Sequence, residues 1–219
     1  MASPRHPYRT ILGGLLLAAS AVLTGCFTGE RPSFESEVAY AAETGNEAID
    51  AVLERLDRAR LATYTGDYDI LTRLGGRDST AHVVQDGPGR RSVTVNSIRF
   101  VVDDGSVATC DLDAEECEAS INDARISDVI ATHDFYADSA ARRLRTDADR
   151  RILEPTGYEI TQAGQTARCV DVPVTGGTVT YCALESGPLA RYDGNDVFVE
   201  LATFSDTPDE AAFDLSPGP

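Results

Sequence analysis

The chain has 219 residues and a formal net charge of −17, from 36 acidic and 19 basic side chains. All of the basic residues are arginine, because the sequence contains no lysine. A chain with this much negative charge repels the phosphate backbone of nucleic acids, which argues against nucleic-acid binding. It repels anionic lipid headgroups for the same reason. The hydrophobic fraction of 42% predicts a folded globule and not a disordered chain.

The N-terminus has the pattern of a secretory signal. Arg5 and Arg9 precede an apolar run over residues 11–23, which is too short to span a bilayer as a helix of about 20 residues. The sequence LTGC, ending at Cys26, resembles a bacterial lipobox. The resemblance implies cleavage before Cys26, lipidation of its thiol and N-acylation, so that acyl chains such as palmitate anchor the protein to the cell membrane. The alternative is an ordinary signal peptide with a chance cysteine.

Composition divides the chain into four parts. Residues 1–25 are predicted to be a lipoprotein signal peptide, and residues 26–43 the lipidated cysteine and a flexible tether. Residues 44–206 are long enough for one domain with a hydrophobic core, which would lie outside the cytoplasm. Residues 207–219 are acidic and contain proline, so a disordered tail is expected.

Four cysteines follow the candidate lipidation site: Cys110, Cys117, Cys169 and Cys182. Outside the cytoplasm they predict two disulfides, and we favour local pairing of the first with the second and the third with the fourth. The first pair flanks a short acidic loop. If Thr175 and Gly176 are the centre of a hairpin turn, the second pair lies directly opposed on adjacent strands. A four-cysteine zinc site is the alternative, although no C-x2-C spacing occurs.

The domain opens with the pattern of an amphipathic helix over residues 45–62, with an apolar stripe that includes Ile49 and Val52. Thr44 and Glu47 have the spacing of a capping box, in which a hydroxyl and a carboxylate satisfy free backbone donors. A period of two follows and predicts an antiparallel meander. Its strands are expected over 64–74, 79–85, 91–95 and 98–102.

The middle of the chain is predicted to be helical over 121–131 and 135–149, and Pro155 ends any helix before it. Strands return over 157–162, 166–174, 178–184 and 195–204. Helix, strands, helical insert and strands in this order predict an α+β fold, in which an antiparallel sheet buries one face against the helices.

Three segments of the last third have a recognisable pattern of turn and strand residues: 163–167 (AGQTA), 181–184 (YCAL) and 186–191 (SGPLAR). They resemble the LolA-like superfamily of exported lipid-binding proteins, with its periplasmic lipoprotein carrier, RseB-type stress sensors and actinobacterial LppX/LprG-type lipoproteins. The resemblance implies an unclosed half-barrel with the N-terminal helix and the central helical insert on its concave face. It also implies a cavity for acyl chains or lipid-modified polypeptide. The insert at 121–150 departs from the family's pattern.

Residues with catalytic potential are few. Beyond the signal peptide the only histidines are His82 and His133, which are interpreted as a sheet-face residue and a helix-capping residue. A G-x-S-x-G elbow, a phosphate loop and an H-E-x-x-H motif do not occur. The acidic segment 111–116 lacks the spacing of a calcium loop, which leaves weak surface calcium binding as its alternative role. We therefore predict no catalytic residue, resident metal or cofactor.

The expected function is that of a lipid-anchored extracytoplasmic binding protein that holds a lipid or acyl chain for carriage or sensing. Apolar residues on the concave face or its helical cover would line the cavity, and the same residues would equally suit a filled core. The alternative function is an envelope interaction or regulatory protein with a packed interior and a protein partner. The candidate ligand-binding residues are Tyr68, Ile70, Ile98, Phe100, Val129, Phe135 and Tyr136.

Overall fold

The computed structural model describes residues 43–126, 132–135 and 139–215, all within one compact unit that spans 42–219. The signal peptide, Cys26 and residues 27–42 of the tether lie outside the described residues, as do the candidates Val129 and Tyr136. In the described part of the chain, no helix is both long enough and apolar enough to cross a membrane.

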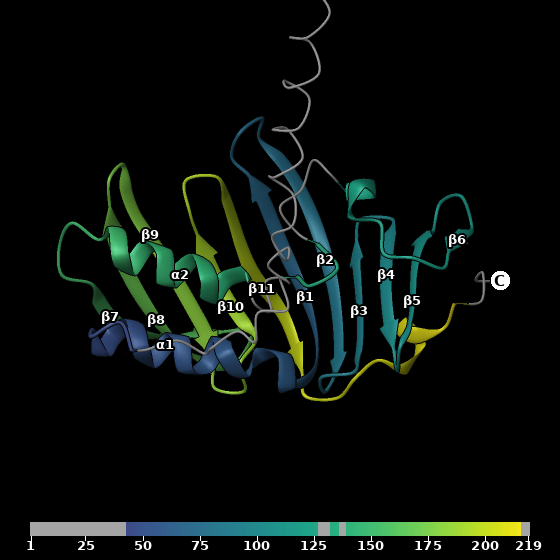
Figure 1. The fold of residues 1–219 in the computed structure, drawn as a ribbon, viewed down its shortest axis with the longest axis horizontal. Helices are drawn as coiled ribbons and strands as arrows, with labels where there is room; N and C mark the ends of the chain where they lie inside the picture. Colours follow the sequence, from purple (N-terminus) through teal and green to yellow (C-terminus); the bar gives the residue numbers. More distant parts are fainter. Residues whose placement is uncertain (1–42, 127–131, 136–138, 216–219) are drawn as a thin grey trace, which may run out of the picture. The chain divides into compact units, whose positions relative to one another are not determined.

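One antiparallel sheet of eleven strands forms the framework of the unit (Figure 1). The strand order is β6-β5-β4-β3-β2-β1-β11-β10-β9-β8-β7, so two meanders meet where β1 pairs with β11, and the sheet stays open at β6 and β7. This agrees with the predicted α+β half-barrel. The strands are β1 (Thr63–Thr72), β2 (Arg77–Asp86), β3 (Arg90–Val95), β4 (Ile98–Asp103), β5 (Ser106–Asp111), β6 (Glu116–Glu118), β7 (Thr156–Gln162), β8 (Gln165–Val174), β9 (Gly177–Leu184), β10 (Leu189–Asp193) and β11 (Val197–Ser205).

The first helix, α1 (Glu47–Arg58), continues into a 3-10 turn, η1 (Ala59–Leu61). The predicted capping box is wrong, because Asn46 is the N-cap and its side chain accepts a hydrogen bond of 3.1 Å from the Ile49 amide. Thr44 instead donates from its amide and its hydroxyl to Asp50, at 2.8 Å each. The helix therefore begins two residues later than predicted.

The central insert is less helical than predicted. Over 121–126 the structure has only a 3-10 turn, η2 (Asp123–Ile126), and Phe135 lies in a turn with φ of +30°. The second helix, α2, covers Ser139–Arg150, so it begins four residues later and ends one residue later than predicted. The two helices contact each other, α1 packs on β7, β8 and β9, and α2 packs on β8, so they cover the sheet in the half formed by the second meander.

A continuous buried cluster fills the space between the sheet and the elements that cover it. A second, smaller cluster lies on the opposite face, because successive residues of a strand point to opposite sides: Val83 belongs to the first cluster and Val84 to the second. The smaller cluster includes Ala212 and Phe213 of η3 (Glu210–Phe213). The structure thus differs from the expected disordered tail over 207–215, because buried apolar side chains hold this segment against the sheet.

Both preferred disulfides form, Cys110–Cys117 between β5 and β6 and Cys169–Cys182 between β8 and β9. In each, the two cysteines are directly opposed in the strand register. The predicted acidic loop between the first two cysteines is therefore the turn of a hairpin.

Candidate functional site

The five described candidates for a ligand cavity come together in the main buried cluster. Tyr68, Ile70, Ile98, Phe100 and Phe135 are each at most 9% exposed. The rings of Tyr68 and Phe135 lie 4.5 Å apart between centroids, with their planes tilted by 54°. The structure therefore places all five residues in one buried cluster, with the rings of Tyr68 and Phe135 in contact.

The Phe135 side chain is held in this position by the residues before it. Arg91 of β3 donates to the Asp134 carbonyl at 3.1 Å and forms an ion pair with the Asp134 carboxylate at 3.2 Å. The Phe135 amide donates to the Thr132 carbonyl at 2.9 Å. A phenylalanine with positive φ occupies a sparsely allowed backbone region, which persists only where surrounding contacts impose it. Phe135 is thus a strained anchor for the insert.

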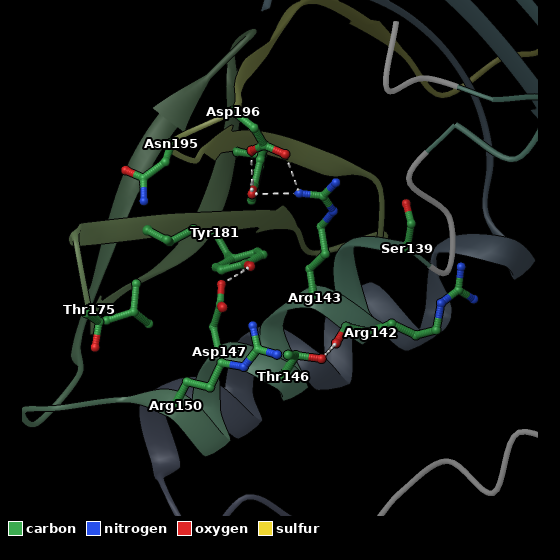
Figure 2. A pocket seen from close by; sticks show the side chains of 13 residues that line it. Ser139, Arg142, Arg143, Thr146, Asp147, Arg150, Thr175, Tyr181, Asn195 and Asp196 are labelled. Atoms are coloured by element: carbon green, nitrogen blue, oxygen red, sulfur yellow. Dashed lines mark hydrogen bonds and ion pairs between the residues drawn. The ribbon is translucent and has the colours of Figure 1, made fainter. Parts of the chain in front are cut away.

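A polar groove lies elsewhere, between α2 and the ends of the strands of the second meander (Figure 2). Its volume is about 850 Å³. One wall is the face of α2 that carries Arg143, Asp147 and Arg150, and the floor includes the rings of Tyr181 and Tyr192. The groove combines apolar ring surface with charged groups, so it differs from the purely apolar cavity that an acyl chain needs.

An ion pair fixes one end of the groove. Arg143 Nη1 donates to Asp196 Oδ2 at 3.0 Å and to the Tyr192 hydroxyl oxygen at 3.1 Å. Partial burial by itself would raise the pKa of Asp196, but the hydrogen bond and charge of Arg143 outweigh it and hold that pKa below its ordinary value. The Arg143 guanidinium is therefore already neutralised and acts as part of the wall.

A second carboxylate of α2 is bound to the floor. The Tyr181 hydroxyl donates to Asp147 Oδ2 at 2.6 Å, and the rings of Tyr181 and Tyr192 lie 5.2 Å apart. Burial, and then the hydrogen bond to the negative Asp147, raise the pKa of Tyr181 well above 10. Tyr181 therefore stays neutral and serves as a hydrogen-bond donor.

Two arginines that line the groove differ from the other described arginines in their lack of a partner. Arg142 and Arg150 are exposed, and among the described residues they have no hydrogen-bond or ion-pair partner for their guanidinium groups. The other described arginines each have an interaction partner. Eight residues separate the two, which places them about 12 Å apart along the helix axis. The lining of the groove carries three arginines and two aspartates, so its net charge is positive although the molecule as a whole is acidic.

Sequence reasoning missed this groove because its walls come from α2 and from turns that follow 25 to 50 positions later, such as those at Thr175 and Asn195. The one local signal was the concentration of arginine between positions 142 and 151 in a chain that is acidic overall.

The fold is an open antiparallel sheet with two helices on one face, and the site is a half-polar groove at the side of the second helix. No protein-family model matches the chain, and no curated protein matches its sequence. Solved structures with a similar arrangement include three of the protein MucB.

The first is a crystal structure of MucB in complex with MucA(peri), with 13% identity and a TM-score of 0.48, covering 76% of this chain and 59% of that one. A crystal structure of MucB has 12% identity and a TM-score of 0.46, covering 78% and 63%. A Pseudomonas aeruginosa MucA/MucB complex has 15% identity and a TM-score of 0.34, covering 76% and 60%. The aligned region is thus about 60% of the length of these chains. At these values the similarity transfers neither a ligand nor a partner.

Proposed function

We propose that the protein is an extracytoplasmic binding protein, held at the cell membrane by lipid on Cys26, that takes an anionic group of an envelope component in the polar groove. The two disulfides support an oxidising compartment outside the cytoplasm. The lipobox resemblance supports the anchor. The proposal includes no catalytic step.

The observation that carries the proposal is the pair of unpartnered arginines at the groove. Guanidinium groups bind carboxylates and phosphates through paired N–H donors, and such charge-assisted hydrogen bonds are the stronger ones in proteins. In a chain of net charge −17, arginines whose guanidinium group has no hydrogen-bond or ion-pair partner are the exception among the described residues. Arg142 and Arg150 therefore offer binding positions for negative groups.

The rest of the groove is suited to orient such a ligand. The Arg143–Asp196 ion pair fixes the distance between α2 and the loop before β11, so this wall needs no rearrangement on binding. The amide side chain of Asn195 and the hydroxyl of Thr146 add donors and acceptors, while the ring of Tyr181 offers apolar contact. A carboxylate of a peptide and a phosphate of a lipid headgroup are the two sources of an anionic group with this chemistry.

The test is native mass spectrometry of the protein with two probes, a peptide with two glutamates and short-chain phosphatidylglycerol. The double substitution Arg142→Gln and Arg150→Gln should lower the affinity for the probe by about tenfold or more. Arg58→Gln, which removes an exposed arginine of α1 outside the groove, is the matched control. Binding of one probe alone identifies the source, and equal binding by wild type and the double variant would overturn the proposal.

A second candidate function, an acyl-chain carrier, is favoured by the strained position of Phe135. Its buried ring lies against Tyr68 of β1. A change of backbone conformation at Phe135 would release the strain of its positive φ, and displacement of the ring would expose apolar surface. Protein purified from its own host and extracted with organic solvent should then yield a bound lipid. Phe135→Ala should raise the lipid content, and lipid-free protein in both forms would rule this function out.

A further inference from the structure

Residues 149–154 are all exposed where α2 ends and the chain leads to β7, and the four at their centre are Arg150, Arg151, Ile152 and Leu153. We call them the basic–aliphatic patch. Ile152 is 59% exposed and Leu153 is 68% exposed. Among the large hydrophobic side chains that are exposed in the described residues, these two are the only neighbours in sequence. Scattered exposed aliphatic side chains are ordinary on a protein surface, but an adjacent pair beside two cations is not.

The backbone presents this patch rigidly. The Ile152 amide donates to the Pro173 carbonyl at 2.9 Å, and Arg151 forms an isolated antiparallel bridge with Val174. Arg151 Nη1 also donates to the Ala148 carbonyl at 2.6 Å, near the C-terminal end of α2. The exposure of Ile152 and Leu153 is therefore a property of a fixed segment that is bonded to β8 and α2.

The patch lies at the corner where the chain enters the domain. The Asn46 side chain, at the start of α1, donates to Glu154 Oε1 at 2.7 Å, and Glu154 directly follows Leu153. Residues 27–43 separate this corner from Cys26. For the flexible tether that the sequence predicts there, the expected root-mean-square end-to-end distance is roughly 20–25 Å. Lipid on Cys26 would thus hold this corner of the domain close to the bilayer.

We propose that the basic–aliphatic patch is a membrane-contact surface that sets the orientation of the tethered domain. Ile152 and Leu153 enter the interface between headgroups and acyl chains, and Arg150 and Arg151 meet anionic headgroups. Asp149 and Glu154 flank the patch, and Glu154 accepts a hydrogen bond from Asn46. The contact therefore depends on Ile152 and Leu153 together with the two arginines, while the net negative charge of the rest of the molecule is repelled by the same headgroups. Because Arg150 also lines the groove, one end of the groove would then open at the headgroup layer.

The location of the domain at a membrane rests on the proposed anchor, so the test supplies a tether that does not depend on Cys26. The protein from residue 27 onward includes the whole compact unit, its buried core and both disulfides. An N-terminal histidine tag attaches it to vesicles of phosphatidylcholine and phosphatidylglycerol that contain a nickel-chelating lipid. Acylation of Cys26 is measured separately, from the mass of the N-terminal peptide of the membrane-bound protein.

The chain has no tryptophan, so one introduced tryptophan is a clean fluorescent reporter. Leu153→Trp reports on the patch, and Leu74→Trp, at a position 91% exposed in the β1–β2 turn, is the matched control. On tethering, the emission of Leu153→Trp should shift to shorter wavelength and be quenched by lipids with brominated acyl chains. The emission of Leu74→Trp should not change.

Two further measurements isolate the role of charge. Arg150→Gln with Arg151→Gln, in the Leu153→Trp background, should reduce the blue shift and the quenching on phosphatidylglycerol vesicles. Vesicles without phosphatidylglycerol should give the same reduction with the arginines intact. The proposal is overturned if Leu153→Trp has the same emission free and tethered, or if Leu74→Trp is quenched equally.

Discussion

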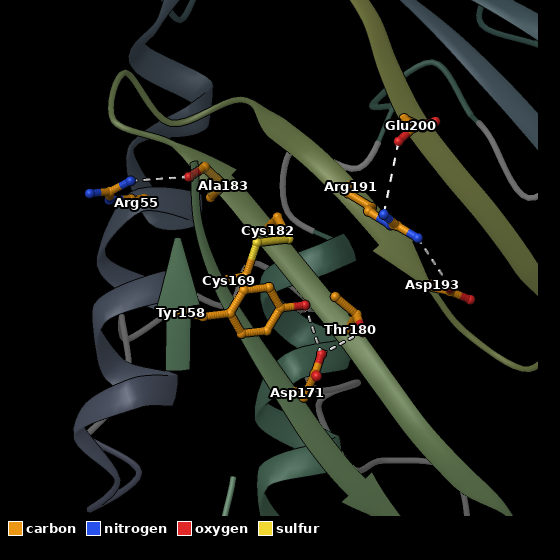
Figure 3. Close-up of a disulfide and its surroundings, with 10 residues drawn as sticks. All are labelled: Arg55, Tyr158, Cys169, Asp171, Thr180, Cys182, Ala183, Arg191, Asp193 and Glu200. Atoms are coloured by element: carbon orange, nitrogen blue, oxygen red, sulfur yellow. Dashed lines mark hydrogen bonds and ion pairs between the residues drawn. A yellow bond between two sulfur atoms is a disulfide. The ribbon is translucent and has the colours of Figure 1, made fainter. Parts of the chain in front are cut away.

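Cys169 and Cys182 face each other across β8 and β9, with Cα atoms 4.0 Å apart and with no exposed surface on either residue. Figure 3 shows the Tyr158 side chain beside this disulfide. The Tyr158 hydroxyl donates to Asp171 at 3.0 Å, and Thr180 donates to the same carboxylate oxygen at 2.6 Å. The disulfide therefore ties together the strands on which α1 and α2 pack.

Removal of this disulfide by the double substitution Cys169→Ala and Cys182→Ala should lower the free energy of unfolding by about 3 kcal/mol, because the unfolded chain regains the entropy of an open loop. Cys110→Ala with Cys117→Ala opens a shorter loop at the sheet edge and should cost about 2 kcal/mol. Urea denaturation of the two double variants measures both values. A larger loss for Cys110–Cys117 than for Cys169–Cys182 would contradict the loop-entropy origin of the two contributions.

The strands that sequence reasoning found are those whose buried positions alternate, as in β1 and β2. β10 was missed because its first two residues, Leu189 and Ala190, are both buried, so the alternation is absent. β5 was missed because its buried residues, 108–110, are consecutive, and β6 was missed because the acidic residues between Cys110 and Cys117 have the composition of a loop. Pairing in the sheet, not local propensity, decides the structure at these positions.

Contacts between distant segments also explain the other differences. Thr44 and Asn46 are both suitable N-caps, and the choice follows from Asp50, which takes both Thr44 donors, and from Glu154, which takes the Asn46 amide. Tyr68 and Ile70 of β1, and Ile98 and Phe100 of β4, are spaced by two and lie in the main buried cluster, but a period of two does not show whether a buried face lines a cavity or a packed core. The groove likewise forms only because α2 lies beside Thr175 and Asn195, which are distant from it in sequence.

Gly187 should tolerate no side chain. Its φ is +114°, and an added Cβ would lie 2.7 Å from the Ala59 backbone nitrogen, at the end of α1. Gly187→Ala should therefore destabilise the protein by more than about 2 kcal/mol, since strain and a backbone clash add. Gly164→Ala, with φ of +76° and nothing near the added Cβ, should cost only about 1 kcal/mol of strain. Thermal unfolding of the two variants gives the comparison, and equal losses would contradict the close packing of this turn on α1.

The segment after β11 should contribute to stability. Phe213 is 7% exposed, packs with Val84 and Val101, and has the Arg90 guanidinium 4.2 Å from its ring centroid. Phe213→Ala should cost about 2–3 kcal/mol, near the lower end for a buried aromatic because the cluster is small. Truncation after residue 206 should cost at least as much in urea denaturation. A truncated protein as stable as the full chain would support the disordered tail that the composition predicts.

Cys26→Ser in the full precursor should abolish acylation and release the domain from membranes, because the thiol that would carry the lipid is gone. The measurement is fractionation after a carbonate wash, with mass spectrometry of the N-terminal peptide as control. Retention of the variant in the washed membrane would show that lipid on Cys26 is not the anchor.

The Arg143–Asp196 ion pair should contribute stability that depends on pH. Arg143 holds the pKa of Asp196 below its ordinary value of 3.8, so the folded protein binds this proton less readily than the unfolded chain does. The contribution is present above the unfolded pKa and is lost as the pH falls through the lower, folded value. The stability difference between wild type and Arg143→Gln should thus be largest above about pH 4 and should shrink at lower pH. Asp196→Asn should remove this pH dependence, and a constant difference from pH 7 to pH 2 by urea denaturation would exclude Asp196 as the linked group.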